Sequence, residues 1–255
     1  LNELGMIFFF RSDYSNALKY YKKAQMLYKK LNDKNKLATI NGNIGLVYRE
    51  QGGLNKSLEY YKKFLHHSEK IGDKMEIITA YGLVGVVYRL LGKLDTGLKY
   101  LKKDLALSSE IGDKEQTKSV LNNIGNIYYI RGELSDALAY YKNAAKLSEE
   151  IGDERSVCIA AANIGCVYYE KGNFAKALQY SKSSYNLAVE IGFKKLVGVA
   201  LNQMGAIHIE TKKFLDADEC IKKAEKICGD IKDKIGLGDV YINFCELNDA
   251  QGNYE

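Results

Sequence analysis

Residues 40–73 have the sequence INGNIGLVYREQGGLNKSLEYYKKFLHHSEKIGD, in which two apolar periodicities are separated by a glycine pair. Apolar side chains recur at helical spacing in both halves, at Ile40, Ile44, Val47 and Tyr48 and then at Leu54, Leu58, Tyr61 and Leu65. Gly52 and Gly72 follow the last turn of each half, where a glycine in left-handed geometry closes a helix. The stretch therefore predicts two helices packed as an antiparallel hairpin.

The same hairpin returns along the chain at intervals of 40 residues. A glycine of the first helix marks each copy, and we expect it where the two helices approach closely, at Gly5, Gly45, Gly85, Gly125, Gly165 and Gly205. The corner Ile71-Gly72-Asp73 also returns, and its aspartate can cap the next helix by accepting a backbone N–H. Self-similarity at a fixed period of this length is typical of helical solenoids.

The repeat predicts an all-α fold of about six and a half helix pairs in one solenoid domain, 1–255. The expected repeat limits are 1–32, 33–72, 73–112, 113–152, 153–192, 193–232 and 233–255. Both ends fall inside a repeat, and neither shows the polar capping element that a solenoid normally has. We therefore expect a piece of a longer protein.

The composition agrees with long, unbroken helices. The 255 residues include no proline, which would interrupt a helix by removing an N–H and clashing with the preceding turn. With 46% hydrophobic and 27% charged residues, the chain is typical of a globular protein and not of a disordered one. No apolar run approaches the ~18 residues of a membrane helix, so no membrane partner is expected. The five cysteines, an odd number, indicate reduced thiols and a cytoplasmic protein.

The pattern Ile44-Gly45-x-x-Tyr48 followed by Ser57-x-x-x-Tyr61-x-x-Phe64 resembles the tetratricopeptide repeat. Other copies carry a small residue at the position of Ser57, namely Ala17, Gly97, Ala137, Ala177 and Ala217. The chain departs from the consensus of about 34 residues in its longer period and its lack of tryptophan and proline. Its longer helices and Gly-Asp corners resemble the variety found in Partner-of-Inscuteable-type adaptors and bacterial Rap-type regulators. The resemblance implies a right-handed superhelix in which first helices line a concave groove and second helices form the convex back.

No constellation of catalytic or metal-binding residues interrupts the repeat. Catalysis would need a nucleophile or an acid–base pair, and the best candidates are His66, His67 and His208. His208 stands where other copies have tyrosine and His67 where they have leucine, so we interpret both as core substitutions. Cys-x-x-Cys and paired-histidine motifs are absent, and no glycine loop for phosphate occurs. We expect no enzyme, no cofactor and no metal site.

Lysines and tyrosines alternate in the second helices, as in Tyr20-Tyr21-Lys22-Lys23 and Tyr60-Tyr61-Lys62-Lys63. Such a pattern superficially suits single-stranded nucleic acid, which binds through stacking and backbone charge. However, one tyrosine per turn belongs to the helix interface, which places the lysines on the solvent-facing back beside Glu59, Glu69 and Asp104. We expect a solvated surface and no nucleic-acid partner.

The opposite face of the first helices carries a row of amides. The row comprises Asn43, Asn122, Asn123, Asn126, Asn163, Asn202 and Gln203. Asparagine is a poor residue for a helix interior, so its recurrence needs a reason. A carboxamide both donates and accepts hydrogen bonds, which suits the backbone of an extended peptide. The alternative is an internal ladder of amides between neighbouring first helices, and the two interpretations are compatible.

Arg49, Arg89, Tyr129 and Tyr169 stand further along the same face and complete the candidate peptide-binding groove. The two arginines lie in an apolar setting, which favours a partner segment with acidic and apolar side chains. We expect a non-catalytic scaffold that holds an extended or helical segment of a partner protein or peptide. The alternative is a regulatory sensor segment of a multidomain signalling protein, whose kinase, cyclase or transcription-regulator output domain lies outside this chain.

Overall fold

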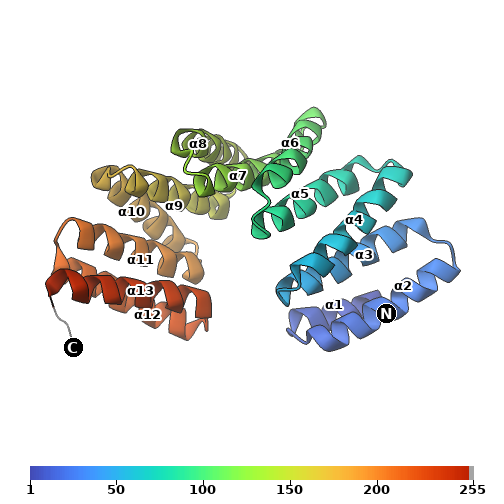
Figure 1. The fold of residues 1–255 in the computed structure, drawn as a ribbon, viewed down its shortest axis with the longest axis horizontal. Helices are drawn as coiled ribbons and strands as arrows, with labels where there is room; N and C mark the ends of the chain where they lie inside the picture. The colour runs from blue at the N-terminus through green and yellow to red at the C-terminus, as the bar shows by residue number, and fades with distance from the viewer. Residues whose placement is uncertain (253–255) are drawn as a thin grey trace. The chain divides into compact units, whose positions relative to one another are not determined.

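The computed structural model describes residues 1–252, which form thirteen α-helices and no strand (Figure 1). The helices are α1 (Asn2–Phe10), α2 (Tyr14–Lys30), α3 (Lys34–Glu50), α4 (Leu54–Ile71), α5 (Lys74–Leu90), α6 (Leu94–Glu110), α7 (Lys114–Ile130), α8 (Leu134–Ile151), α9 (Glu154–Glu170), α10 (Phe174–Glu190), α11 (Lys194–Glu210), α12 (Phe214–Asp230) and α13 (Lys234–Gln251). The predicted all-α fold is confirmed.

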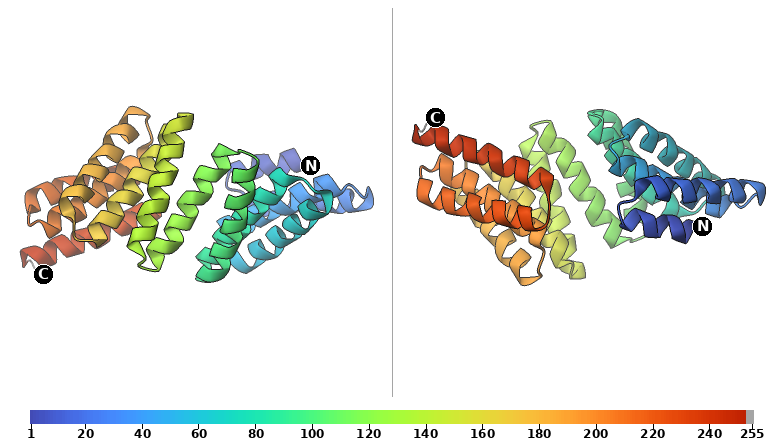
Figure 2. Two further views of the ribbon diagram at one scale, coloured as in Figure 1. Left: turned by 90° about the horizontal axis from the view of Figure 1, so that it is seen from above. Right: turned by 90° about the horizontal axis from the view of Figure 1, so that it is seen from below.

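Helices that follow one another in the chain pack side by side as antiparallel pairs. Helix α3 packs on α4, α5 on α6, α9 on α10 and α11 on α12. Neighbouring pairs are also in contact, because α4 packs on α5 and α10 on α11, and Figure 2 shows this stacking within each half of the chain. The solenoid of helix pairs that the 40-residue period predicts is therefore confirmed.

The chain divides into two compact units, Leu1–Ile127 and Tyr128–Glu255, and each has apolar cores of its own. In the first unit, buried side chains that include Tyr21 and Ile44 join α2 to α3. In the second unit, one cluster extends from Cys158 on α9 to Val240 on α13. The predicted extent of a single domain and its repeat limits stay a prediction.

The corners between helices form as the sequence predicts. Gly72 ends α4 with φ 80° and Gly152 ends α8 with φ 73°, the left-handed conformation that favours glycine. Asp73 then caps α5, since its carboxylate accepts from the backbone N–H groups of Met75 at 2.9 Å and Glu76 at 3.1 Å. Four corners place a non-glycine residue in the left-handed conformation, at Ser12, Asn32, Lys212 and Lys232. Those corners carry backbone strain that the glycine corners avoid.

The glycine in the first helix of a pair lets a large side chain of the second helix reach the backbone. A Cβ added to Gly45 would lie 2.6 Å from Cδ1 of Tyr61, whose side chain is fully buried. A Cβ added to Gly205 would lie 2.7 Å from Cγ1 of Ile221. At both positions the glycine marks a close approach of the two helices, as the repeat predicts.

Candidate functional site

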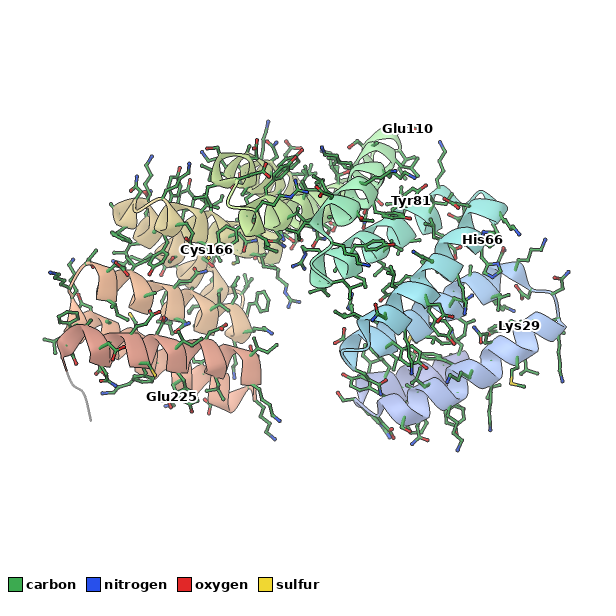
Figure 3. All side chains as sticks on the ribbon, in the orientation of Figure 1. Lys29, His66, Tyr81, Glu110, Cys166 and Glu225 are labelled. Carbon is green, nitrogen blue, oxygen red and sulfur yellow. The ribbon has the colours of Figure 1, made fainter. Side chains whose placement is uncertain are left out.

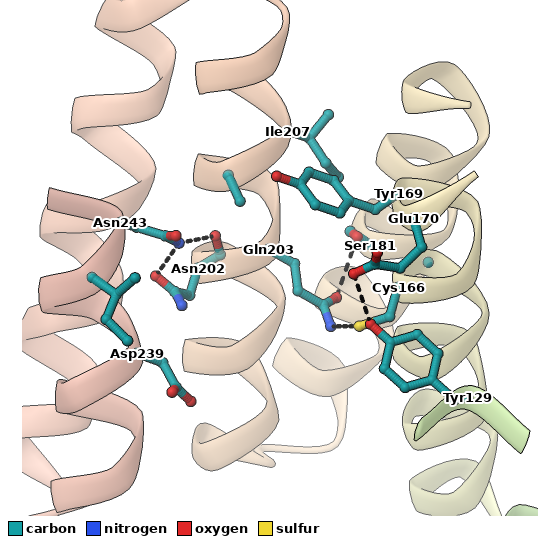
Figure 4. Close-up of a pocket in the computed structure, with 13 residues that line it drawn as sticks. Tyr129, Cys166, Tyr169, Glu170, Ser181, Asn202, Gln203, Ile207, Asp239 and Asn243 are labelled. Atoms are coloured by element: carbon teal, nitrogen blue, oxygen red, sulfur yellow. Dashed lines mark hydrogen bonds between the residues drawn. The ribbon is translucent and has the colours of Figure 1, made fainter. Parts of the chain in front are cut away.

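A pocket of about 440 Å³ opens in the second unit among α9, α11 and α13, beside the last turn of α7 (Figure 4). It occupies the face on which the sequence places the amide row. The lining consists of Tyr129, Gly165, Cys166, Tyr169, Glu170, Ser181, Asn202, Gln203, Ala206, Ile207, Asp239, Ile242 and Asn243. Only Ser181 comes from the second helix of a pair, α10, and it explains why the pocket exists.

A large core side chain is missing beneath the pocket. In other pairs the residue that faces the first-helix glycine is bulky, as Tyr61 is opposite Gly45. In the pocket the facing residue is Ser181, and its Oγ would lie 3.0 Å from a Cβ added to Gly165. Ser181 is fully buried. Because a serine fills much less of the interface than a tyrosine ring, the remaining space opens toward the face formed by the first helices.

Two tyrosines of the lining donate hydrogen bonds to glutamates. Tyr129 donates its hydroxyl to Oε1 of Glu170 at 3.1 Å, and one period later Tyr169 donates to Oε1 of Glu210 at 3.5 Å. Burial, reinforced by the nearby carboxylates, raises the pKa of Tyr129 well above its usual range and the pKa of Tyr169 to about 12. Both phenols therefore keep their protons at neutral pH and act as donors.

Amide groups link the helices around the pocket. Gln203 of α11 donates Nε2 to Sγ of Cys166 on α9 at 2.9 Å, and its Oε1 accepts from the Ser181 hydroxyl at 3.3 Å. Burial raises the pKa of the Cys166 thiol to about 11, so the thiol stays protonated at neutral pH. Asn243 of α13 donates to Oδ1 of Asn202 on α11 at 2.8 Å. These bonds hold α9, α11 and α13 together along the pocket.

The charged groups in the lining are all acidic. Glu170 and Asp239 are exposed, and the described lining includes no lysine or arginine. Carboxylates in a pocket can pair with an amine or a guanidinium and can accept from backbone N–H groups. The nucleophilic side chains, Ser181 and Cys166, are both bonded to Gln203, and an amide is not a base. The carboxylates, phenols and amides of this arrangement can bind a polar ligand.

Comparison with known sequence families identifies the family of this chain. The sequence profile of the tetratricopeptide repeat matches residues 1–67, 76–150 and 117–188, which together exceed half of the chain. The chain is a tetratricopeptide-repeat (TPR) protein. Among curated proteins, none matches this TPR chain in sequence.

Several solved structures are similar to the TPR chain in fold. BtubC (BKLC) from P. vanneervenii has a TM-score of 0.70 at 17% identity, over 87% of this chain and 90% of that one. A Signal Transduction ATPase with Numerous Domains (STAND) protein with a tetratricopeptide repeat sensor, from Pyrococcus horikoshii, has a TM-score of 0.78 at 24% identity, over 99% of this chain and 39% of that one. A Rap protein complexed with competence and sporulation factor has a TM-score of 0.69 at 16% identity, over 98% and 74%. At these identities the similarity concerns the fold alone.

Some of the groove residues predicted for this TPR protein meet in the pocket, and the others do not. Those in the lining are Tyr129, Tyr169, Asn202 and Gln203. The other seven are half-buried elsewhere on the first helices, namely Asn43, Arg49, Arg89, Asn122, Asn123, Asn126 and Asn163. Ser181 and Asp239 were not predicted. The signal for Ser181 was present, because alignment of the repeats puts it at the position of Tyr61.

The ladder alternative for the TPR amide row occurs in both units. In the first unit, Asn43 donates to Oδ1 of Asn2 on the preceding first helix at 3.0 Å. In the second unit, Asn243 and Asn202 make the equivalent link between α13 and α11 at 2.8 Å. Asn123 instead donates to a backbone carbonyl of its own helix, at 3.1 Å. At these positions the amides stabilise the solenoid itself.

The histidines of this TPR protein differ in their surroundings. His208 is only 7% exposed, which confirms its interpretation as a core residue, and burial lowers its pKa. His67 is half-buried, and His66 is exposed on α4 (Figure 3). Across residues 1–252, no three side chains of His, Cys, Asp or Glu converge as metal ligands would. Within the same range, no helix combines the length and the apolar character needed to span a bilayer.

Proposed function

We propose that this TPR protein is a non-catalytic, cytoplasmic scaffold that binds a segment of a partner protein or peptide on the groove face of its second unit. The observation that carries the proposal is the pocket of about 440 Å³ above Ser181. Ligand sites typically have volumes of about 300–1,000 Å³ and a few polar groups that fix orientation. In this pocket the phenol of Tyr129, the amide of Asn202 and the carboxylate of Asp239 supply such groups.

An extended segment suits this face because it would cross several first helices in turn. Packed helices lie about 8–10 Å apart, and an extended chain advances about 3.3 Å per residue. About three residues of the segment would therefore span the distance from one first helix to the next. The phenols and amides of α9, α11 and α13 could then bond its backbone, while one of its side chains enters the pocket.

The charges of the pocket favour a basic side chain in the segment. Glu170 and Asp239 would pair with its ammonium or guanidinium group. The preference for acidic and apolar side chains predicted from Arg49 and Arg89 concerns the first unit. There the Arg49 guanidinium binds the Glu50 carboxylate at 2.9 Å, which reduces its attraction for a further acid. We therefore place the specific contact in the second unit and a weaker acidic or apolar one in the first.

A second candidate function is that of a sensor segment in a larger signalling protein. The STAND protein, in which a tetratricopeptide repeat serves as the sensor, favours this alternative, since this chain corresponds to 39% of its length. The Rap protein complexed with competence and sporulation factor supports binding by a solenoid of this type. In this alternative the ligand would act on a kinase, cyclase or transcription-regulator domain outside this chain.

Selection from a peptide-display library tests the proposal. We expect the wild-type protein to enrich peptides that contain lysine or arginine. Ser181→Tyr should weaken the enriched peptides about tenfold or more, because a ring at this position occupies the pocket as Tyr61 occupies the space beneath Gly45. Ser183→Tyr is the matched control, because Ser183 is exposed on the same helix.

The Ser183→Tyr variant should bind the peptides as the wild type does, and circular dichroism melting should show that both variants fold. Peptides that bind the two variants equally well would contradict the proposed site. Enrichment of acidic peptides instead would contradict the charge assignment.

A further inference from the structure

Aromatic rings stack in pairs between the two helices of successive TPR hairpins. A ring from the first helix lies against a ring twelve residues later in the second helix. The ring centroids are separated by 5.3 Å in Phe8–Tyr20, 5.6 Å in Tyr48–Tyr60, 5.6 Å in Tyr88–Tyr100, 5.3 Å in Tyr128–Tyr140 and 5.5 Å in Tyr168–Tyr180. Five consecutive hairpins therefore fill the same place in the same way.

The next hairpin, α11 and α12, lacks both rings. His208 and Cys220 occupy the two positions, and both side chains are smaller than tyrosine. The helices nevertheless pack on each other as the other pairs do. A pocket of about 380 Å³, lined by His208 and Cys220, opens where the ring pair would be. The vacancy follows from two substitutions that face each other across one hairpin.

The lysines that accompany the ring pair elsewhere are retained at this pocket. Lys62 Nζ lies 5.3 Å from the centroid of Tyr88, and Lys63 Nζ lies 4.6 Å from the centroid of Tyr60. Lys182 precedes His208 by the same number of residues as Lys62 precedes Tyr88, and Lys223 follows Cys220 as Lys63 follows Tyr60. Both Lys182 and Lys223 line the pocket. The cations are present, and the rings that they would cover are absent.

The ion pair of Lys223 does not prevent such a contact. Lys223 binds Glu219 at 2.5 Å, and Lys63 binds Glu59 at the same distance while it also lies over the Tyr60 ring. A lysine at this repeat position can therefore hold a carboxylate and cover a ring at once. The lining also includes a third lysine, Lys213, and two acids, Asp216 and Glu219, so lysines outnumber carboxylates by three to two.

We propose that the pocket at His208 and Cys220 is a second binding site, separate from the groove pocket, that takes an electron-rich aromatic ring such as indole from a partner's side chain or a small molecule. The ring would replace the missing pair, with the ammonium groups of Lys182 and Lys223 against it. Tryptophan-type rings bind cations best among the aromatic side chains.

Fluorescence anisotropy of an indole ligand tests this site without interference, because the protein contains no tryptophan. N-acetyltryptophanamide and a short tryptophan-containing peptide are titrated with the full chain, and a cyclohexylalanine peptide competes as the non-aromatic control. We expect saturable binding of indole and little competition by cyclohexyl. Binding of the peptide alone would identify a protein side chain as the occupant, whereas binding of both would identify a free aromatic molecule as well.

Two double variants make the test specific. His208→Tyr with Cys220→Tyr restores the ring pair of the other hairpins, so it should fold and should weaken indole binding about tenfold or more by occupying the site. Lys182→Ala with Lys223→Ala keeps the space and removes the cations, so it should weaken indole but not alter any residual cyclohexyl binding. Absence of indole binding to the wild type, unchanged binding by the ring-restored variant, or equal binding of indole and cyclohexyl would each overturn the proposal.

Discussion

Replacing Gly45 by alanine should destabilise the protein, whereas the same change at Gly165 should not. Both glycines occupy the same repeat position inside a first helix, so the gain in helix propensity of about 1 kcal/mol is common to both changes. The opposing residue differs. At Gly45 the new Cβ would lie 2.6 Å from Cδ1 and 2.7 Å from Cε1 of the Tyr61 ring. At Gly165 the nearest atom is Oγ of Ser181 at 3.0 Å, which can rotate away.

The size of the effect follows from overpacking at Tyr61. Its ring is fully buried and would have to retreat by about 1 Å to restore a contact of about 3.5–4.0 Å. Inserting a methyl group into a packed core costs about 1–3 kcal/mol. Subtracting the propensity gain leaves Gly45→Ala destabilised by about 0–2 kcal/mol, while Gly165→Ala is stabilised by up to about 1 kcal/mol. The two variants should therefore differ by about 1–3 kcal/mol.

Urea unfolding followed by circular dichroism measures this difference, and hydrogen exchange locates it in the unit that carries the change. A rescue variant provides the control, because Gly45→Ala should cost nothing when Tyr61→Ser already reproduces the arrangement at Gly165. Equal midpoints for the two alanine variants, or a lower midpoint for Gly165→Ala, would refute the explanation given for the groove pocket.

Three further outcomes are expected. Lys212→Gly should raise the melting temperature, because a φ of 57° costs a non-glycine residue about 1 kcal/mol, and Gly132→Ala, at φ 74°, should lower it. Asp104, which we expected on the solvent-facing back, is instead fully buried on α6. Burial raises its pKa from 3.8 to about 7, so the folded carboxyl keeps a proton that the unfolded chain releases. The contribution of Asp104 to stability should thus fall as pH rises from 3.8 to about 7, and urea titrations of Asp104→Asn should lack that contribution. In calorimetry, Asn202→Ala should weaken a selected peptide by up to about tenfold through the loss of one hydrogen bond to the peptide, and Lys63→Ala should not.

The sequence was sufficient for the fold because the signals for it are local and recur. The glycine at a helix corner needs a left-handed φ, and the aspartate after it needs only the next two or three N–H groups. Gly72 with Asp73 and Gly152 with Asp153 show both. The close approach at Gly45 is less local, yet it also recurs at a fixed position. Each further copy with the same residues at the same positions therefore strengthens the prediction of the helix pair.

The candidate sites depend instead on pairs of departures that face each other across a hairpin. His208 stands out in the sequence as a departure, but its pairing with Cys220, twelve residues away on the next helix, was not predicted. Ser181 was not predicted, because its alignment with Tyr61 was not combined with the close approach of helices expected at Gly165. The ion pair of Arg49 was also not evident from the sequence. Its partner Glu50 is the next residue, and side chains one apart on a helix do not normally face each other.

A repeat protein provides its own reference for such departures, because the other copies show what each substitution removes. At Ser181 the reference is a buried ring such as Tyr61, and the loss leaves the groove pocket. At His208 the reference is a stacked ring pair, worth about 0.5–1.5 kcal/mol beyond its buried area, and the loss leaves the second pocket. The hairpins that contain Ser181 and His208 therefore lack packing energy that the equivalent positions of the other hairpins have, from bulky core side chains in the first case and from stacked rings in the second. A ligand that restores the missing contacts recovers that energy, and for this reason the second unit is where binding is expected.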